Sequence, residues 1–467
     1  YKAWNWNVLE IDGNDPEQIR KALKAANEET ARPTLIIGHT IMGKGARKAD
    51  GESFESDCGT HGAPLGGNAY IETIKNLGAD PEDPFHIFPE VAEMYKARLS
   101  ELTQEVEQIR QAEKKWAQEN PEKSQLLSDW FNQKLPEIPW DKLEQKPNKA
   151  TRDGSKAVLA LLSEYVPNMI VSSADLCNSD KTDGFLAYTT PISRTNFAGG
   201  FLQAGVSELS MACVCIGMML HGGIISAMGT FFVFSDYMKP AVRMAALMET
   251  PVKFVWTHDA FRVGEDGPTH EPVEQEAQIR LMEKLKNHSG KDSVRVFRPC
   301  NNQAATQCWR LAMENVETPT ALIFSRQAIK DLPEGVDYIG VEKGAYEVVK
   351  EEHPDVILLA SGSEVSTLVD TLPLLQEKNI KARIISCPSE GLFRRQSAEY
   401  QEKLLPADAK IFALTAGLPA TFEGLVGRNG YIYGLDHFGY SAPYQVLDDK
   451  LGFTPQQVAD KIIDFVK

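Results

Sequence analysis

One short segment concentrates polar side chains directly after an expected buried strand. The apolar run Lys253–Trp256 ends in Thr257-His258-Asp259, and Gly264-Glu265-Asp266-Gly267-Pro268-Thr269-His270 follows a few residues later. Glycines and a proline fix the backbone of that segment. Ligands of open α/β folds bind at the carboxyl ends of strands, and functional groups favour rigidly placed loops. We therefore expect these imidazoles and carboxylates to act on a small polar molecule.

Alternating strands and helices are expected to position this segment. Near the N-terminus, strands are predicted at 7–11 and 35–37. The helix between them begins with a capping Asp15, Pro16 at its first position and Gln18 three residues after the cap. Such a strand–helix–strand fragment cannot close a parallel sheet alone, because parallel sheets need both faces covered.

The chain divides into four predicted regions, three of which are α/β units. Residues 81–150 are rich in Glu, Lys and Gln and predict exposed helices followed by a Pro-rich linker. The expected fold class is α/β, with three consecutive parallel-sheet units of which the first is incomplete. The four regions are 1–80, 81–150, 151–331 and 338–467.

The second and third units carry the clearest apolar runs. Expected strands lie at 170–171, 224–225, 254–255, 356–360 and 382–386. Expected helices lie at 203–220 and 237–248, and a further helix begins at Ser361–Glu364.

Composition narrows the class of protein. The 467 residues carry a formal net charge of -16, which argues against a general nucleic-acid surface but leaves room for a local cationic pocket that binds phosphorylated substrates. No apolar run reaches the roughly 20 residues that span a bilayer, so no membrane association is expected. Seven scattered cysteines without a CxxC pair favour reduced thiols in the cytoplasm.

Several motifs, in the same order along nearly the whole chain, resemble those of transketolases. They are Thr60–Gly66, Ser173-Ala174-Asp175-Leu176, Val242–Leu247, Gly264–Gln275 and Ser325-Arg326-Gln327. The resemblance implies the thiamine-diphosphate-binding fold followed by a transketolase C-terminal domain. Residues 1–80 would then end the diphosphate-binding domain, 151–331 would form the pyrimidine-binding domain, and 338–467 the C-terminal domain.

The resemblance also implies an activity and its setting. Transketolases use thiamine diphosphate to transfer a two-carbon ketol unit reversibly between sugar phosphates in the pentose phosphate pathway. Xylulose 5-phosphate would be a donor and ribose 5-phosphate an acceptor. The expected state is a cytoplasmic homodimer whose active site lies at the subunit interface.

Residues that match the family's catalytic and cofactor positions follow from the resemblance. Glu208 matches the glutamate that binds a ring nitrogen of the aminopyrimidine and activates the cofactor. His61 and His270 match substrate-channel histidines that can move protons. Cofactor contacts are expected from Phe231, Phe234, Tyr237, Asp175 and His61. Without the resemblance, core packing would be the better interpretation of the aromatic residues.

A second set matches the positions that bind substrate. The resemblance assigns the substrate phosphate to Arg152, Ser179, His258 and Arg326, and a sugar hydroxyl to Asp266. Guanidinium groups suit phosphate because they bind its oxygens bidentately. Cys177-Asn178 stands where the family has Ala-Pro, so the loop that carries Ser179 is expected to differ in shape.

The family's metal motif, Gly-Asp-Gly, is absent from the sequence. Mg²⁺ or Ca²⁺ is therefore expected to bind ligands upstream of Tyr1, and no metal ligand is assigned within the chain. The break would fall inside the first domain, and this chain alone is expected to be inactive. The alternative is a non-catalytic protein, or a half that depends on a partner, among thiamine-diphosphate enzymes.

Other members of the cofactor class remain possible, namely dihydroxyacetone synthase and deoxyxylulose phosphate synthase. The segment His61–Gly66 and the phosphate-binding set favour transketolase. Near the C-terminus, Gly439-Tyr440-Ser441-Ala442-Pro443 also resembles the family, and dimer packing is its expected role.

Overall fold

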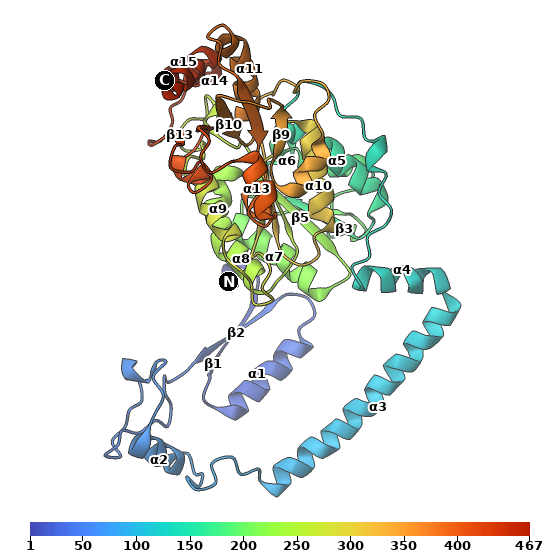
Figure 1. Ribbon diagram of the computed structural model, residues 1–467. Helices are drawn as coiled ribbons and strands as arrows, with labels where there is room; N and C mark the ends of the chain where they lie inside the picture. The colour runs from blue at the N-terminus through green and yellow to red at the C-terminus, as the bar shows by residue number, and fades with distance from the viewer. The chain divides into compact units, whose positions relative to one another are not determined.

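The computed structural model describes residues 1–467 as two units, 1–118 and 119–467, each of which is described by itself. In the first unit, β1 (Asn7–Asp12) and β2 (Thr34–His39) form a two-stranded parallel sheet joined by α1 (Pro16–Glu28) (Figure 1). Asp15 caps α1 by accepting hydrogen bonds from the backbone N–H groups of Glu17 and Gln18, as the sequence predicts.

The rest of the first unit consists of helices joined by irregular segments. Its elements are η1 (Lys2–Trp4), η2 (Cys58–Thr60), α2 (Gly67–Asn76) and α3 (Pro89–Glu119), whose last residue begins the second unit. The 31 residues of α3 include none that is buried, which agrees with the predicted exposed connector. No helix of the structure is both long and apolar enough to cross a membrane.

The second unit begins with α4 (Pro121–Phe131) and η3 (Trp140–Lys142) and then forms a six-stranded parallel sheet in the order β4-β3-β5-β6-β8-β7. The strands are β3 (Met169–Ser173), β4 (Phe201–Gln203), β5 (Ile225–Phe231), β6 (Lys253–Thr257), β7 (Arg295–Phe297) and β8 (Thr320–Phe324). Helix α5 (Thr151–Tyr165) precedes these strands. The elements between them are α6 (Cys177–Asp180), η4 (Thr182–Ala187), α7 (Glu208–His221), η5 (Phe232–Phe234), α8 (Ser235–Leu247), η6 (Phe261–Val263), α9 (Gln275–Glu283) and α10 (Asn302–Glu314).

Helices cover both faces of this sheet. Alternate strand residues such as Met228 and Phe254 pack with α7 and α8, whereas Val255 and Leu322 pack with α5 and α10. The central strands are therefore almost entirely apolar and buried, as two-sided cover requires.

The helix predicted at 203–220 begins instead at Glu208. Residues 201–203 pair with 171–173 as the edge strand β4, and the chain then turns before the helix starts. Three residues of edge strand are too few to show a periodicity of two in the sequence.

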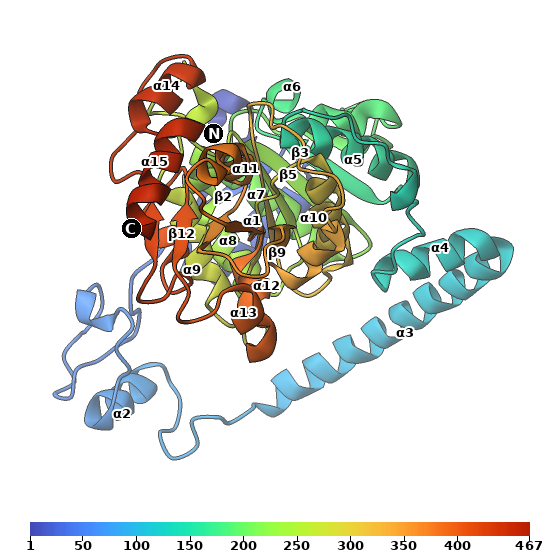
Figure 2. The ribbon, with the colours of Figure 1, turned by 45° about the horizontal axis from the view of Figure 1, so that its top comes forward.

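The C-terminal domain adds a five-stranded sheet in the order β13-β12-β10-β11-β9. Its strands are β9 (Tyr346–Val349), β10 (Val356–Ala360), β11 (Ala382–Ser386), β12 (Ile411–Leu414) and β13 (Tyr431–Tyr433). Its helices are η7 (Tyr338–Lys343), α11 (Glu364–Gln376), α12 (Glu390–Arg394), α13 (Ala398–Leu404), η8 (Pro419–Phe422), α14 (Tyr444–Leu451) and α15 (Pro455–Val466). Helices α11 and α15 pack against each other (Figure 2). The expected α/β class is confirmed, and β9 is the one strand that pairs antiparallel, with β11.

Candidate active site

The carboxyl edge of the six-stranded sheet gathers predicted site residues from four strands. Asp175 follows β3, Phe231 ends β5, His258 follows β6 and Arg326 follows β8. These strands run parallel, so their carboxyl ends meet at one edge, where α/β folds bind ligands. Residues separated by as many as 151 positions in the chain thus share one edge.

Aromatic rings form a continuous array at this edge. The ring of Phe231 stacks on His258 with centroids 3.6 Å apart, and on Phe234 at 6.0 Å. Phe234 stacks in turn on Tyr237 at 6.0 Å and meets the edge of His270 at 5.3 Å. Tyr237 remains 62% exposed. The array offers flat apolar faces and the half-buried imidazole of His270 to a flat heteroaromatic ligand.

Glu208 occupies a position that suits such a ligand. It is the first residue of α7, where the helix dipole favours negative charge, and its side chain is buried. Its carboxylate accepts one long hydrogen bond, 3.3 Å, from the Thr230 hydroxyl, and Thr230 precedes Phe231 on β5. A buried carboxylate with spare acceptor capacity needs a donor or a shared proton. A protonated ring nitrogen would supply it, so these residues fit an aminopyrimidine.

Two arginines stand side by side without a carboxylate hydrogen-bonded to either. Arg152 lies in the first turn of α5, and the Ser325 N–H donates to the Thr151 hydroxyl at 2.7 Å, which brings Arg326 beside it. The Arg152 Nη1 donates to the Ser179 carbonyl at 2.8 Å and contacts the His258 Nε2 at 3.3 Å, while its Nε is buried without a partner. Burial lowers the pKa of Arg152, and the charge of Arg326 lowers it further. Unpaired cations at a helix N-terminus form an anion site.

His258 is held neutral inside this cationic group. Burial, followed by the charges of Arg152 and Arg326, lowers the pKa of His258 to about 2. Because the guanidinium of Arg152 can only donate, the His258 Nε2 accepts, and the Nδ1–H then donates to the Thr257 hydroxyl at 2.8 Å. His258 therefore cannot serve as a proton store near neutral pH.

Backbone strain marks two of the same positions. His258 and Asp175 both have φ of 63°, a region that side chains other than glycine rarely adopt and that clusters at functional sites. The next residue, Asp259, receives hydrogen bonds from Arg298 Nη2 and Nε at 2.7 and 3.0 Å. Arg298 also pairs with Glu364 at the start of α11. The C-terminal domain thus takes part in holding the residue next to His258.

The remaining predicted residues are less tightly held. His270 is half-buried and its Nδ1 contacts the Thr269 hydroxyl at 2.8 Å, whereas Asp266 is exposed on the same loop. Ser179 lies in α6 and contacts Arg152 through its carbonyl rather than its hydroxyl. His61 belongs to the first unit, where it is exposed at the end of η2.

The sequence did not predict a role for Thr230 or Arg298. Thr230 could have been predicted from its position one residue before Phe231, because Glu208 needs a hydrogen-bond donor from the same edge of the sheet. Arg298 gives no such signal, since its partners Asp259 and Glu364 are 39 and 66 residues away. No group of three or more His, Cys, Asp or Glu residues in the structure could hold a metal ion.

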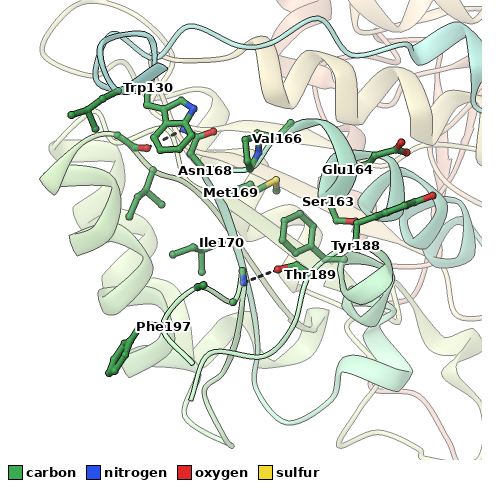
Figure 3. A pocket seen from close by; sticks show the side chains of 18 of the residues that line it. Trp130, Ser163, Glu164, Val166, Asn168, Met169, Ile170, Tyr188, Thr189 and Phe197 are labelled. Carbon is green, nitrogen blue, oxygen red and sulfur yellow. Dashed lines mark hydrogen bonds between the residues drawn. The ribbon is translucent and has the colours of Figure 1, made fainter. Parts of the chain in front are cut away.

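A large cavity lies elsewhere. It has a volume of about 750 Å³ and is lined by Trp130, Asn168, Met169, Ile170 and residues near them (Figure 3). Met169 begins β3 and Ile224 immediately precedes β5, so this cavity lies at the amino edge of the sheet, away from the candidate site.

A doubly wound parallel sheet with a buried carboxylate, an aromatic array and an unpaired cationic pair defines an α/β enzyme that takes a flat cofactor and an anionic substrate. Family models agree with this class. Residues 1–136 match the thiamine diphosphate binding domain of transketolase, 148–331 its pyrimidine binding domain, and 344–454 a transketolase-like C-terminal domain.

Individual relatives narrow the class to one family. A transketolase of Halalkalibacterium halodurans is 38% identical over 467 residues, covering 98% of this chain and 67% of the relative. A Bacillus subtilis transketolase is 36% identical over 473 residues, covering 99% and 68%. The structure of Leishmania mexicana transketolase has a TM-score of 0.89 at 30% identity, covering 100% and 67%. A Pichia stipitis transketolase in complex with sedoheptulose 7-phosphate has a TM-score of 0.87 at 30% identity, covering 100% and 68%. The chain belongs to the transketolase family of thiamine-diphosphate-dependent transferases.

Proposed function

We propose that the protein transfers a two-carbon ketol unit reversibly from a ketose phosphate such as xylulose 5-phosphate to an aldose phosphate such as ribose 5-phosphate, in the pentose phosphate pathway. The main support for a phosphorylated substrate comes from Arg152 and Arg326. These two arginines are neighbours beside the aromatic array, and neither forms an ion pair with a carboxylate. Support also comes from solved structures of Pichia stipitis transketolase with sedoheptulose 7-phosphate, and of its mutants with xylulose 5-phosphate and with fructose 6-phosphate.

Each residue has a stated part in the proposal. Thiamine diphosphate, when bound, supplies the nucleophilic carbon that carries the ketol unit. Glu208 binds and shares a proton with the aminopyrimidine, which Phe231, Phe234 and Tyr237 hold by ring contacts, with Asp175 nearby. His270 and His61 donate to substrate oxygens and move protons during carbon–carbon cleavage.

The proposed binding of the substrate phosphate rests on the positive charge of two arginines. Arg152 and Arg326 bind the phosphate, and the hydroxyl of Ser179 and the imidazole of His258 complete its surroundings. Because His258 is neutral, the net positive charge comes from the two guanidinium groups. Asp266 accepts a hydrogen bond from a sugar hydroxyl and so selects its configuration.

We also propose that the protein is a cytoplasmic homodimer with the active site at the interface. Support comes from α7 and α8, which pack on each other and leave a row of apolar side chains exposed. They include Leu209, Val214, Tyr237, Met244 and Leu247, and Met248 directly follows α8. Light scattering that gives the mass of one chain under assay conditions would contradict the dimer.

Mg²⁺ or Ca²⁺ is the metal proposed for the diphosphate end of the cofactor. Dialysis against a chelator is expected to abolish turnover, and added Mg²⁺ is expected to restore it. Full turnover after exhaustive chelation would contradict a metal requirement. The comparisons do not favour the non-catalytic alternative, because the relatives that match nearly the whole chain are curated as transketolases.

The central test is a coupled assay with xylulose 5-phosphate and ribose 5-phosphate. Arg326→Ala is expected to raise the KM for the phosphorylated sugars about 10- to 100-fold, because charge-assisted hydrogen bonds are worth roughly 1.5–3 kcal/mol. The KM for an unphosphorylated ketose should change little. Arg428→Ala, at an exposed arginine of the C-terminal domain, is the matched control. Equal effects of Arg326→Ala on both kinds of sugar would remove Arg326 from the phosphate site.

A further inference from the structure

A loop of the C-terminal domain contacts the segment that carries Asp266 and His270. Residues 434–443 connect β13 to α14. Within this loop, the Ser441 hydroxyl donates to the Glu265 carbonyl at 2.6 Å, across 176 residues of sequence. The motif for which the sequence suggested only dimer packing therefore lies against the candidate active site of its own chain.

The backbones of the two loops approach closely. A Cβ atom on Gly267 would lie 3.0 Å from the Ser441 side chain, and one on Gly264 would lie 3.4 Å from the Ala442 carbonyl. Both glycines have positive φ, 90° at Gly264 and 73° at Gly267. Glycine is therefore favoured at both positions by backbone conformation, and at Gly267 also by the close approach of Ser441.

Glu271 makes a second contact with the same loop. Its side chain is 2% exposed, and neither carboxylate oxygen has a hydrogen-bond partner. A Cβ atom on Gly439 would lie 1.7 Å from the Glu271 Oε2, so the carboxyl group presses directly on the backbone of Gly439. Burial raises the pKa of Glu271 to about 8. A neutral carboxyl group is what such an unpaired position tolerates.

The two contacts with the 434–443 loop lie on either side of Asp266 and His270 in the sequence. Glu265 immediately precedes Asp266, and Glu271 immediately follows His270. Between them the segment has only its own turns, such as the His270 N–H to Gly267 carbonyl bond at 2.9 Å, and most of its side chains are exposed. His270 meets Phe234 and Phe231 through ring edges, which restrain its position weakly.

We propose that the 439–442 loop of the C-terminal domain is a positioning element for the reaction, with Ser441 and Gly439 fixing the backbone on either side of Asp266 and His270. This inference rests on the proposed ketol transfer. Ser441 touches neither substrate nor cofactor; it acts through the Glu265 carbonyl. The role of the C-terminal domain in turnover is thus to hold the active-site segment within one chain.

The first test is Ser441→Ala in the complete protein. Loss of one hydrogen bond worth about 1 kcal/mol predicts a kcat about fivefold lower, with the KM for sugar phosphates nearly unchanged because the arginines lie on other elements. Thiamine diphosphate affinity should also be unchanged. Ser397→Ala removes an exposed hydroxyl that caps α13 in the same domain and serves as the matched control. A kcat within 1.5-fold of the unmodified protein would overturn the proposal.

A double-mutant cycle tests the second contact. Gly439→Ala drives a methyl group into Glu271 and is expected to lower kcat more than Ser441→Ala does. The same substitution in a Glu271→Ala background, where the space is vacant, should cost at least threefold less. Equal costs of Gly439→Ala in the two backgrounds would overturn the contact between Gly439 and Glu271.

Hydrogen exchange separates this inference from the proposed activity. Amides of 264–271 should exchange faster in Ser441→Ala than in the unmodified protein, whether or not ketol transfer is found. Unchanged exchange there would overturn the positioning role. Absence of ketol transfer in the unmodified protein would overturn the proposed function instead.

Discussion

Both units of the chain contain parallel strands connected by helices, but the fraction of their side chains that is buried differs sharply. In the first unit the buried side chains are Ala22, Ala46 and Thr73, and Leu23 on α1 is 54% exposed. In the second, all five residues of β6 are buried. Strand β1 has one paired neighbour, whereas β6 lies between β5 and β8 with helices on both faces.

This difference shows what a local sequence pattern can and cannot specify. Apolar periodicity and capping residues determine which segments become strands and helices. The number of neighbouring elements determines how much apolar surface leaves water, and hence how firmly a side chain is held. Site residues on the second unit are therefore placed by a packed sheet, whereas His61 depends on a sparsely packed region.

The largest expected effect contrasts Glu208 with His61. Glu208→Ala should abolish measurable ketol transfer while leaving the far-ultraviolet circular dichroism unchanged, because the substitution removes the group that shares a proton with the aminopyrimidine. His61→Ala should lower kcat by about 100-fold, within the range for a general acid or base. Turnover in Glu208→Ala comparable to that of the unmodified protein would refute the role assigned to Glu208.

Glu208→Gln is the control for size and polarity. It retains the volume and hydrogen-bonding atoms of the side chain but cannot take up the same proton. Activity equal to the unmodified protein in Glu208→Gln would show that the carboxyl group is not needed for its charge or proton.

The second prediction concerns the stability of the two sheets. Amides of β1 and β2 should exchange with solvent at least about 100-fold faster than those of β5 and β6, because an isolated two-stranded sheet is marginal in water. Exchange followed by mass spectrometry, with peptides covering 7–39 and 225–257, measures the difference directly. Equal protection would mean that another surface covers β1 and β2, and the contrast between the units would disappear.

Much of the architecture was predictable from the sequence, and the reasons are local. The strands at 254–255 and 356–360 are confirmed, and each is a continuous apolar run. The strand at 7–11, which has Val8, Leu9 and Ile11, is confirmed too, as is the start of α1, where Asp15 is the cap. The start of α7 was misplaced because β4 is a three-residue edge strand, and the antiparallel β9 has no signature in its own residues.

The candidate site likewise has a part that the sequence predicted and a part that it did not. The resemblance supplied residue types and order, and the structure brings Phe231, His258 and His270 together, but their roles stay predictions. The groups that fix those residues were beyond prediction. Asp259 is held by Arg298 and Glu265 by Ser441, and each partner comes from a distant element that only the folded sheet order brings near.

The smallest expected effect uses one lysine from each unit. Lys253 begins β6, and its ammonium group donates to the carbonyls of Pro251 and Asn315 at 2.5 and 2.9 Å without a carboxylate partner. Burial, assisted by the charge of Arg295, lowers the pKa of Lys253 to about 7. Lys24 on α1 is 77% exposed and lies 3.9 Å from Glu28.

The sign of the pH dependence follows from proton binding. Between about pH 7 and the usual lysine pKa near 10.4, the unfolded chain binds a proton that the folded protein binds less tightly, so Lys253 makes stability rise with pH. Lys253→Met should remove up to about 1.4 kcal/mol per pH unit from that slope, measured by urea unfolding at pH 7, 8 and 9. Lys24→Met should leave the slope unchanged. If both variants kept the slope of the unmodified protein, the interior around β6 would admit water, and the contrast in burial would be smaller than the structure indicates.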